Sequence, residues 1–440
     1  MNKTLQVALV GAFVLRLALF RLGAFELLGE RVELVTPVTS LARVREGVFL
    51  HAQGLSPYAG SMFHQSPLVL LLFTPLVESR VALELFFTLL DLLTAVVVFR
   101  IAQLWSARAA ERAEQEAAIA IRFHALAPEQ QARCERADVP HFAIVPTLSA
   151  TAVAVLYLFN PFSILSCLAM STVGLKTLAA LAAALFALQG RATLAALAVS
   201  LGAFDSLGHT YTLIPGLVLL LRTHARHHDA GALRILLPAA AASGALFGAC
   251  WLAMHSFEFV DEVFGFELLV RDLTPNLGLF WYLFTEMFKE FALFYLCVLQ
   301  FFVFVFAWPL SIRLERHPLL LFWVLLASAN TFRAYPAVGD LASTLALVPL
   351  LLAVVRELKY SYIIFIAWVF LAGLAPIFWH IWIHAGSGNA NFFYALNLVH
   401  TMAQIHLIVD TVAAVLRRDY LTKRPAKKKA AAAGSAKKDD

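Results

Sequence analysis

Apolar residues dominate this chain in long stretches that short polar segments separate, and the alternation of polar and apolar positions typical of strands does not compete with this pattern. Each stretch has roughly 16–25 residues, enough for a helix to cross a hydrocarbon core about 30 Å thick. The pattern therefore predicts an all-α, polytopic transmembrane helical bundle of about twelve helices. We expect them over residues 4–22, 81–104, 146–168, 172–189, 192–206, 208–222, 234–255, 291–310, 318–333, 340–355, 361–383 and 393–415.

The composition argues against a water-soluble protein. Of the 440 residues, 61% are hydrophobic and only 14% are charged. The mean hydropathy is +0.77, whereas soluble domains have about 25% charged residues. We expect one transmembrane domain over residues 1–418, with loops at about 23–66 and 105–145, followed by a basic tail over residues 419–440.

The positions of Lys and Arg predict the orientation. Basic residues follow the predicted helices that end at 104, 222, 310 and 355, and they fill the tail. Because short basic loops stay in the cytosol, we expect both termini and the loop 105–145 there, and the loop 23–66 in the lumen. Arg31, Arg43 and Arg45 oppose this assignment of the loop 23–66. Since Glu residues are interleaved with them, we interpret the loop as a folded, charge-paired element.

The end of the tail has the form of a retrieval signal. Lys437 and Lys438 lie four and three positions from the C-terminus, the form of a dilysine signal that returns membrane proteins to the endoplasmic reticulum. Such signals are read only on a cytosolic tail. The alternative is a lysine-rich tail that ends this way by chance. The signal predicts a multi-pass protein of the endoplasmic reticulum membrane.

The first predicted lumenal loop holds acidic residues near polar ones. Glu30 and Glu33 precede His64 and Gln65, which lie beside two Ser-Pro turns. Carboxylates that converge on one hydroxyl can act as a general base, as in polyprenyl-phosphate-dependent GT-C glycosyltransferases. Arg31 would neutralise one of the carboxylates, so the alternative is a structural, ion-paired loop.

Two further segments combine aromatic and amide side chains at the expected membrane interface. One contains Asn276 and Trp281, which fit either an interfacial anchor or a groove for a glycan or lipid headgroup. The other runs from Trp379 and His380 through a Gly/Asn turn to Asn389 and Asn391. Asn can donate and accept without charge, and aromatic faces stack on sugars, so this segment suggests ligand binding; a tight turn alone would also need Gly and Asn.

Charged residues within the predicted helices are candidates for function, but pairs that fix helix packing are the commoner case. They are Asp91, Lys176, Asp205, His209, Asp340 and Asp410. No motif of a zinc protease, α/β-hydrolase or nucleotide-binding loop accompanies them. We therefore expect no metal, no cofactor and no nucleic acid partner.

At the segments ERVELVTPVTS, SPYAGSMFHQSPL, FNPFSILSC, DLTPNLGLFWYLFTEMF, YPAVGD and FWHIWIHAGSGNANFFYAL, the sequence resembles the class U subunit of the glycosylphosphatidylinositol (GPI) transamidase. The matching segments occur in family order over nearly the whole chain. The resemblance implies a GT-C-like membrane fold. It also implies a non-catalytic subunit of a complex in which the class K cysteine protease attaches GPI to precursor proteins. The implied partners are the class K, S and T subunits, the GPI-anchor attachment protein and the GPI lipid itself.

Such a subunit would hold the GPI lipid through an apolar groove with amides and aromatic rings at its lumenal lip. The residues expected at this lip are His64, Asn276, Trp281, Trp379, His380, Asn389 and Asn391. Two alternatives remain open. An active dolichol-phosphate-dependent GT-C glycosyltransferase would need carboxylates, but the DxD motif is missing. A lipid transporter should show inverted repeats, and none is visible.

Overall fold

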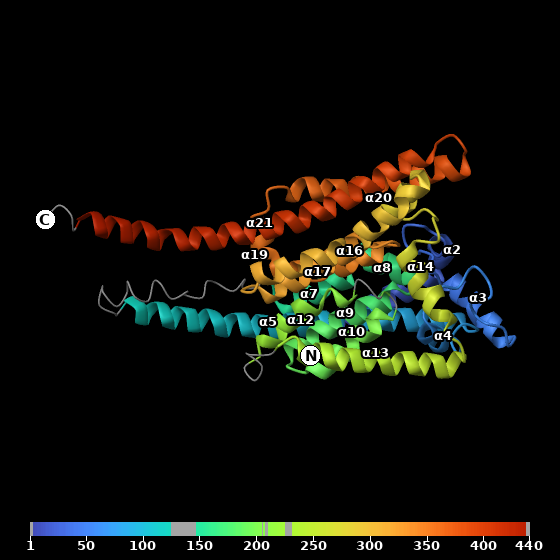
Figure 1. Cartoon of the computed structure of the whole chain (residues 1–440), viewed down its shortest axis with the longest axis horizontal. Helices are drawn as coiled ribbons and strands as arrows, with labels where there is room; N and C mark the ends of the chain where they lie inside the picture. Colours follow the sequence, from blue (N-terminus) through green and yellow to red (C-terminus); the bar gives the residue numbers. More distant parts are fainter. Residues whose placement is uncertain (1–2, 125–146, 205, 207–209, 225–230, 437–440) are drawn as a thin grey trace.

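The computed structural model describes residues 3–124, 147–204, 206, 210–224 and 231–436, with side chains for these residues outside 112–124 and 421–436. The regular secondary structure of these residues is helical, and Figure 1 shows the longer helices running roughly along one common axis. The all-α fold class predicted from the sequence is confirmed.

The helices fall into three consecutive groups. The first comprises α1 (Lys3–Arg21), α2 (Ala24–Leu28), α3 (Leu41–Ala52), α4 (Pro67–Phe73), α5 (Arg80–His124), α7 (Ala150–Leu158) and α8 (Pro161–Leu168). The second comprises α9 (Val173–Leu188), α10 (Ala192–Ala203), α12 (Ile214–Arg222), α13 (Leu233–Met254), the π-helix η2 (Val260–Gly265), α14 (Phe266–Leu269) and α15 (Phe280–Glu286). The third comprises α16 (Lys289–Arg313), α17 (Pro318–Thr331), α18 (Val338–Leu345), η3 (Val348–Leu351), α19 (Leu352–Val355), α20 (Ser361–Trp379), the π-helix η4 (His380–His384) and α21 (Ala390–Ala436).

Each of the twelve predicted segments overlaps a helix. In the described ranges, seven helical segments are long and apolar enough to cross a membrane alone, and the bent pair α7 and α8, at 48°, makes an eighth. Three apolar helices, α9, α10 and α17, are shorter, with 10–17 residues. The chain is therefore a multi-pass membrane protein, and the number of about twelve crossings stays a prediction.

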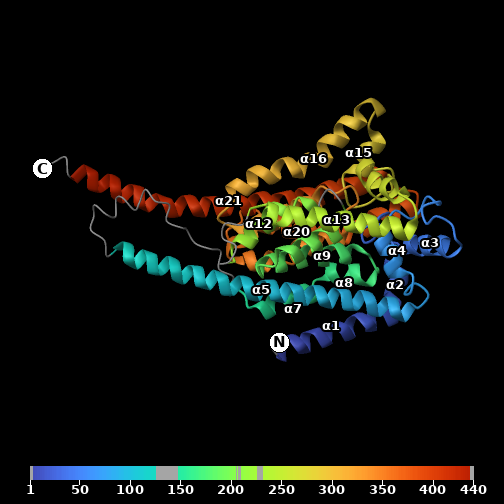
Figure 2. The same cartoon turned by 60° about the horizontal axis from the view of Figure 1, so that its bottom comes forward.

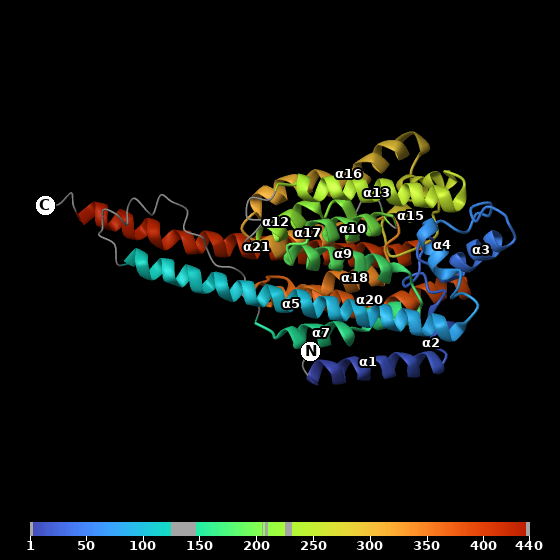
Figure 3. The same cartoon turned by 90° about the horizontal axis from the view of Figure 1, so that it is seen from below.

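The bundle has two different ends. Residues 23–66, 255–288 and 384–390 gather at one end, called here the loop-rich end; α5 and α21 project from the opposite end, called here the tail end (Figures 1 and 2). The start of α1 also lies toward the tail end (Figure 3). Both ends of the described chain therefore lie toward one end of the bundle, as an even number of crossings requires.

Burial separates central from peripheral helices. About half or more of the spanning window is buried in α5 and α21, at 56% each, but only 17% in α13, α16 and α20. Close packing in the centre depends on small residues, since α9 and α10 are rich in Ala and a Cβ on Gly216 of α12 would lie 2.7 Å from the backbone of α17. The peripheral helices present apolar faces to lipid or to other membrane helices.

An ion pair inside the bundle fixes α1 against α5. Arg16 is fully buried, and its guanidinium donates to Asp91 at 2.5 Å and to the Leu158 carbonyl at 2.9 Å. Tyr157 donates to the other oxygen of Asp91 at 2.8 Å. The sequence left open whether Asp91 is functional or part of a packing pair, and the structure shows the pair, which a charge at membrane depth needs.

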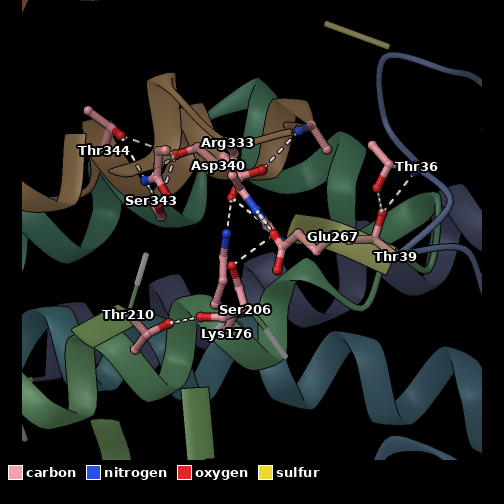
Figure 4. A network of polar contacts seen from close by, with 12 residues as sticks. Thr36, Thr39, Lys176, Ser206, Thr210, Glu267, Arg333, Asp340, Ser343 and Thr344 are labelled. Atoms are coloured by element: carbon pink, nitrogen blue, oxygen red, sulfur yellow. Dashed lines mark hydrogen bonds and ion pairs between the residues drawn. The ribbon is translucent and has the colours of Figure 1, made fainter. Parts of the chain in front are cut away.

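A second polar network lies near the loop-rich end (Figure 4). Asp340 of α18 accepts from Lys176 of α9 and from Arg333 at 3.3 Å, and Arg333 also donates to Glu267 of α14 at 3.3 Å. Ser206 adds a hydrogen bond to Glu267 at 3.0 Å. The four charged residues are almost fully buried. They lock α18 onto α9 and α14, which confirms the paired interpretation of Lys176 and Asp340.

The loop 23–66 is folded, and the predicted pairing with an interleaved Glu is confirmed for Arg31. Arg31 donates to Glu33 at 2.9 Å. Arg43 has its partner outside the loop, since it donates to Asp272 at 2.8 Å. Burial opposes ionisation of Asp272, but the hydrogen bonds from Thr274 and Arg43 outweigh it and hold the pKa of Asp272 below its ordinary value of 3.8. This ion pair ties the loop to the segment that leads into α15.

Candidate functional site

An aromatic cluster joins three segments that are far apart in the sequence. Trp281 of α15 stacks on Trp382 of η4 with ring centroids 6.0 Å apart, and Trp379 of α20 lies 5.3 Å from Phe393 of α21. Tyr394 contacts Trp281 edge to face at 5.8 Å. The structure thus brings together Trp281 and Trp379, which the sequence analysis placed in two separate segments.

Amide side chains lie at the exposed edge of this cluster. Asn391 accepts a hydrogen bond from the Tyr282 hydroxyl, and Asn389 accepts from the Asn391 backbone N–H at 3.1 Å. Both amides are exposed, and so is His380, whose ring lies 5.4 Å from that of His384. Asn389 and Asn391 therefore form a polar rim next to the aromatic rings.

Two predicted site residues lie elsewhere and have structural contacts. Asn276 is fully buried; its Oδ1 accepts from the Gly278 N–H at 2.7 Å, and its backbone carbonyl accepts from Asn397 at 2.5 Å. His64 is buried against Phe266, with ring centroids 3.7 Å apart, and bonds to backbone carbonyls. Asn276 shapes the turn before α15, and His64 joins the loop 23–66 to α14.

A groove of about 470 Å³ opens beside the aromatic cluster. Its walls come from α2, α8, α18, α20 and α21, and they are largely aliphatic: they include Leu28, Leu165, Leu341, Leu371 and Leu396. Leu371 and Leu396 also belong to the aromatic cluster, so the groove and the cluster are continuous. An apolar groove of this size with aromatic and amide groups nearby suits an amphipathic ligand.

Three polar residues line the same groove. Arg31 and Glu33 form their ion pair at its edge, so the carboxylate of Glu33 is engaged and cannot converge with Glu30 as a free base. The third is His400 of α21, which is only 6% exposed. Sequence analysis missed His400. Its signal was an ionisable residue within an apolar helix, the criterion that singled out Asp410.

The remaining candidates fall into two groups. Asp410 accepts from the Tyr360 backbone N–H at 2.9 Å and so caps the start of α20. Asp205, His209 and the predicted retrieval signal, Lys437 and Lys438, lie outside the described residues.

These features define a multi-pass membrane protein with a largely aliphatic groove between its helices. Residues 10–400 match the family model described as GPI transamidase subunit PIG-U. The chain is 34% identical to the human GPI-anchor transamidase component PIGU, over 96% of this chain and 95% of that protein. It is 31% identical to the GPI transamidase component GAB1 homolog of Schizosaccharomyces pombe, over 91% and 90%, and 28% identical to GAB1 of Saccharomyces cerevisiae, over 95% and 96%.

The chain belongs to the PIG-U family of GPI transamidase subunits. It is therefore a component of the GPI transamidase complex, and it acts in GPI-anchor biosynthesis together with other subunits. The resemblance found in the sequence motifs is confirmed.

Proposed function

We propose that this subunit binds the GPI lipid and presents it for attachment to precursor proteins, while catalysis lies in a separate cysteine-protease subunit. The loop-rich end would face the lumen of the endoplasmic reticulum, with both termini in the cytosol. The other proposed partners are the class S and T subunits and the GPI-anchor attachment protein.

The observation that carries this proposal is the continuity of the groove with the aromatic and amide rim. GPI has acyl chains that stay in the bilayer and a glycan just above it. The aliphatic walls around Leu371 and Leu396 suit the chains. Asn391 at the polar rim and the partly exposed Tyr282 beside it suit the glycan, because aromatic faces stack on sugar rings and amides pair with hydroxyl groups. The engaged carboxylate of Glu33 argues against a glycosyltransferase.

The test narrows the groove from one of its walls. Leu371→Trp places a larger side chain in the groove wall, and the matched control is Val369→Trp on the same helix, where the side chain is 56% exposed and outside the groove lining. The tagged full-length chain is captured from cells with its complex in mild detergent. Mass spectrometry then quantifies the bound GPI and the other subunits.

We expect Leu371→Trp to reduce bound GPI at least tenfold while the other subunits still co-purify, and Val369→Trp to change neither. Unchanged GPI in Leu371→Trp, with the complex intact, would refute the proposal. If purified wild-type protein instead transferred sugar from a dolichol-linked donor, the protein would be a glycosyltransferase and the proposed lipid-presenting role would be wrong.

A further inference from the structure

His400 is a polar group placed in the aliphatic part of the groove. Its side chain is 6% exposed and makes no hydrogen bond with any residue in the described part of the chain. Its ring nitrogens are not fully enclosed, in contrast to the indole nitrogen of Trp368, which lines the same groove. Buried polar groups in native proteins are nearly always hydrogen-bonded. The occupant of the groove is therefore expected to supply the partner of His400.

The depth of His400 indicates which part of a lipid it would meet. One turn before it on α21, Asn397 donates to the backbone carbonyl of Asn276 at 2.5 Å, so this part of α21 lies beside the loop that leads into α15. The spanning segment Ala390–Tyr420 has 31 residues, about 46 Å of helix against a core of about 30 Å. His400 thus lies close to the boundary between loops and bilayer, at the depth where acyl chains join a lipid headgroup.

We propose that His400 donates a hydrogen bond to an ester carbonyl of the glycerolipid part of GPI. This inference rests on the proposed function, because it assumes that the groove holds that lipid. A neutral imidazole has one N–H donor, and an ester carbonyl is a better acceptor than an ether oxygen. His400 therefore makes the groove select lipids by the linkage of their chains. The aliphatic walls contact the chains but do not distinguish ester from ether linkage.

The experiment compares two phosphatidylinositols with chains of equal length, one with two ester-linked chains and one with two ether-linked chains. The purified full-length complex is incubated with each in detergent, and retained lipid is measured by mass spectrometry. The wild type should bind the ester form about five- to tenfold more tightly, the effect of one buried hydrogen bond. His400→Phe keeps a ring but removes the hydrogen-bond donor. It should lower the affinity for the ester-linked lipid alone, so that both lipids bind equally.

Two more variants separate this inference from the proposed function. His400→Gln keeps a donor and should restore part of the preference, which a purely structural role would not predict. Leu371→Trp should lower the binding of both lipids. If Leu371→Trp lowers the binding of both lipids but His400→Phe keeps the wild-type preference for the ester form, the groove still binds lipid and the role of His400 is refuted. If Leu371→Trp binds both lipids as the wild type does, the lipid lies elsewhere and the proposed function also fails.

Discussion

The ion pair between Arg16 and Asp91 gives the sharpest stability prediction. Arg16 is fully buried, 2.5 Å from Asp91. Arg16→Met leaves a buried carboxylate without its counter-charge, and Asp91→Asn leaves the guanidinium without one. Breaking a buried pair in this way costs about 3–5 kcal/mol, whereas replacing both partners by uncharged side chains of similar size is often nearly neutral. We therefore expect each single variant to lose about 3–5 kcal/mol of unfolding free energy.

The double variant tests whether the charges of Arg16 and Asp91 stabilise each other. Arg16→Met with Asp91→Asn should be no less stable than the milder single variant, which corresponds to a coupling energy of about 3 kcal/mol or more. Unfolding is followed in detergent micelles by circular dichroism during a denaturant titration. Losses that simply add in the double variant would show that the two charges do not stabilise each other.

A matched control lies on the same two helices. Arg21 of α1 is 3.9 Å from Glu84 of α5, its own side chain is 69% exposed, and the buried Glu84 keeps a closer partner in Arg80 at 2.9 Å. Solvent screens such a pair, so Arg21→Met should change stability by no more than about 1 kcal/mol. A loss equal to that of Arg16→Met would mean that contact between α1 and α5, rather than the buried charge, determines the result.

Two further predictions concern packing and pH. Gly216→Ala should lower the free energy of unfolding by about 1–3 kcal/mol, because the new Cβ would lie 2.7 Å from the backbone of α17. Gly244→Ala should not lower it, because its new Cβ would have no atom within 4 Å, and equal unfolding free energies of the two variants would refute this packing. The lowered pKa of Asp272 means that the hydrogen bonds it accepts from Thr274 and Arg43 stabilise the fold above its unfolded pKa of 3.8, and that this contribution is lost as the pH falls through the folded pKa. Asp272→Asn should therefore destabilise the protein at about pH 6 and progressively less below about pH 3.8; a difference that does not depend on pH would contradict this.

Helix positions could be predicted from the sequence because the hydropathy of a membrane-spanning segment is a local property. The partners of charged residues are not local. Asp91, Lys176 and Asp340 were recognised as candidates for pairs, but Arg16 is 75 residues from Asp91 and Lys176 is 164 residues from Asp340. Without a fold, nothing in the sequence indicates which charge meets which.

The residue types of the candidate site could be predicted from the sequence better than the positions of those residues in space. Trp281 and Asn391 were selected by residue type, and Tyr282 connects them: its ring lies 5.3 Å from that of Trp281, and its hydroxyl donates to Asn391. Asn276 has the same residue type, but the turn before α15 uses its side chain, a role that only the local backbone reveals. The groove is a gap between helices from distant parts of the chain, so no sequence pattern could have indicated it.

The position of Arg16 also has a consequence for the synthesis of the protein. The segment α1 leaves the ribosome before α5, and Asp91 follows Arg16 by 75 residues, about 4–15 s at roughly 5–20 residues per second. During this interval α1 carries an arginine at membrane depth without its carboxylate, at a cost of about 2.5–3.5 kcal/mol on the insertion scale. The nascent α1 therefore has reason to stay beside the insertion machinery until α5 emerges. The pair thus favours an order of assembly as well as a contact, because α1 is more stable in lipid once α5 lies beside it.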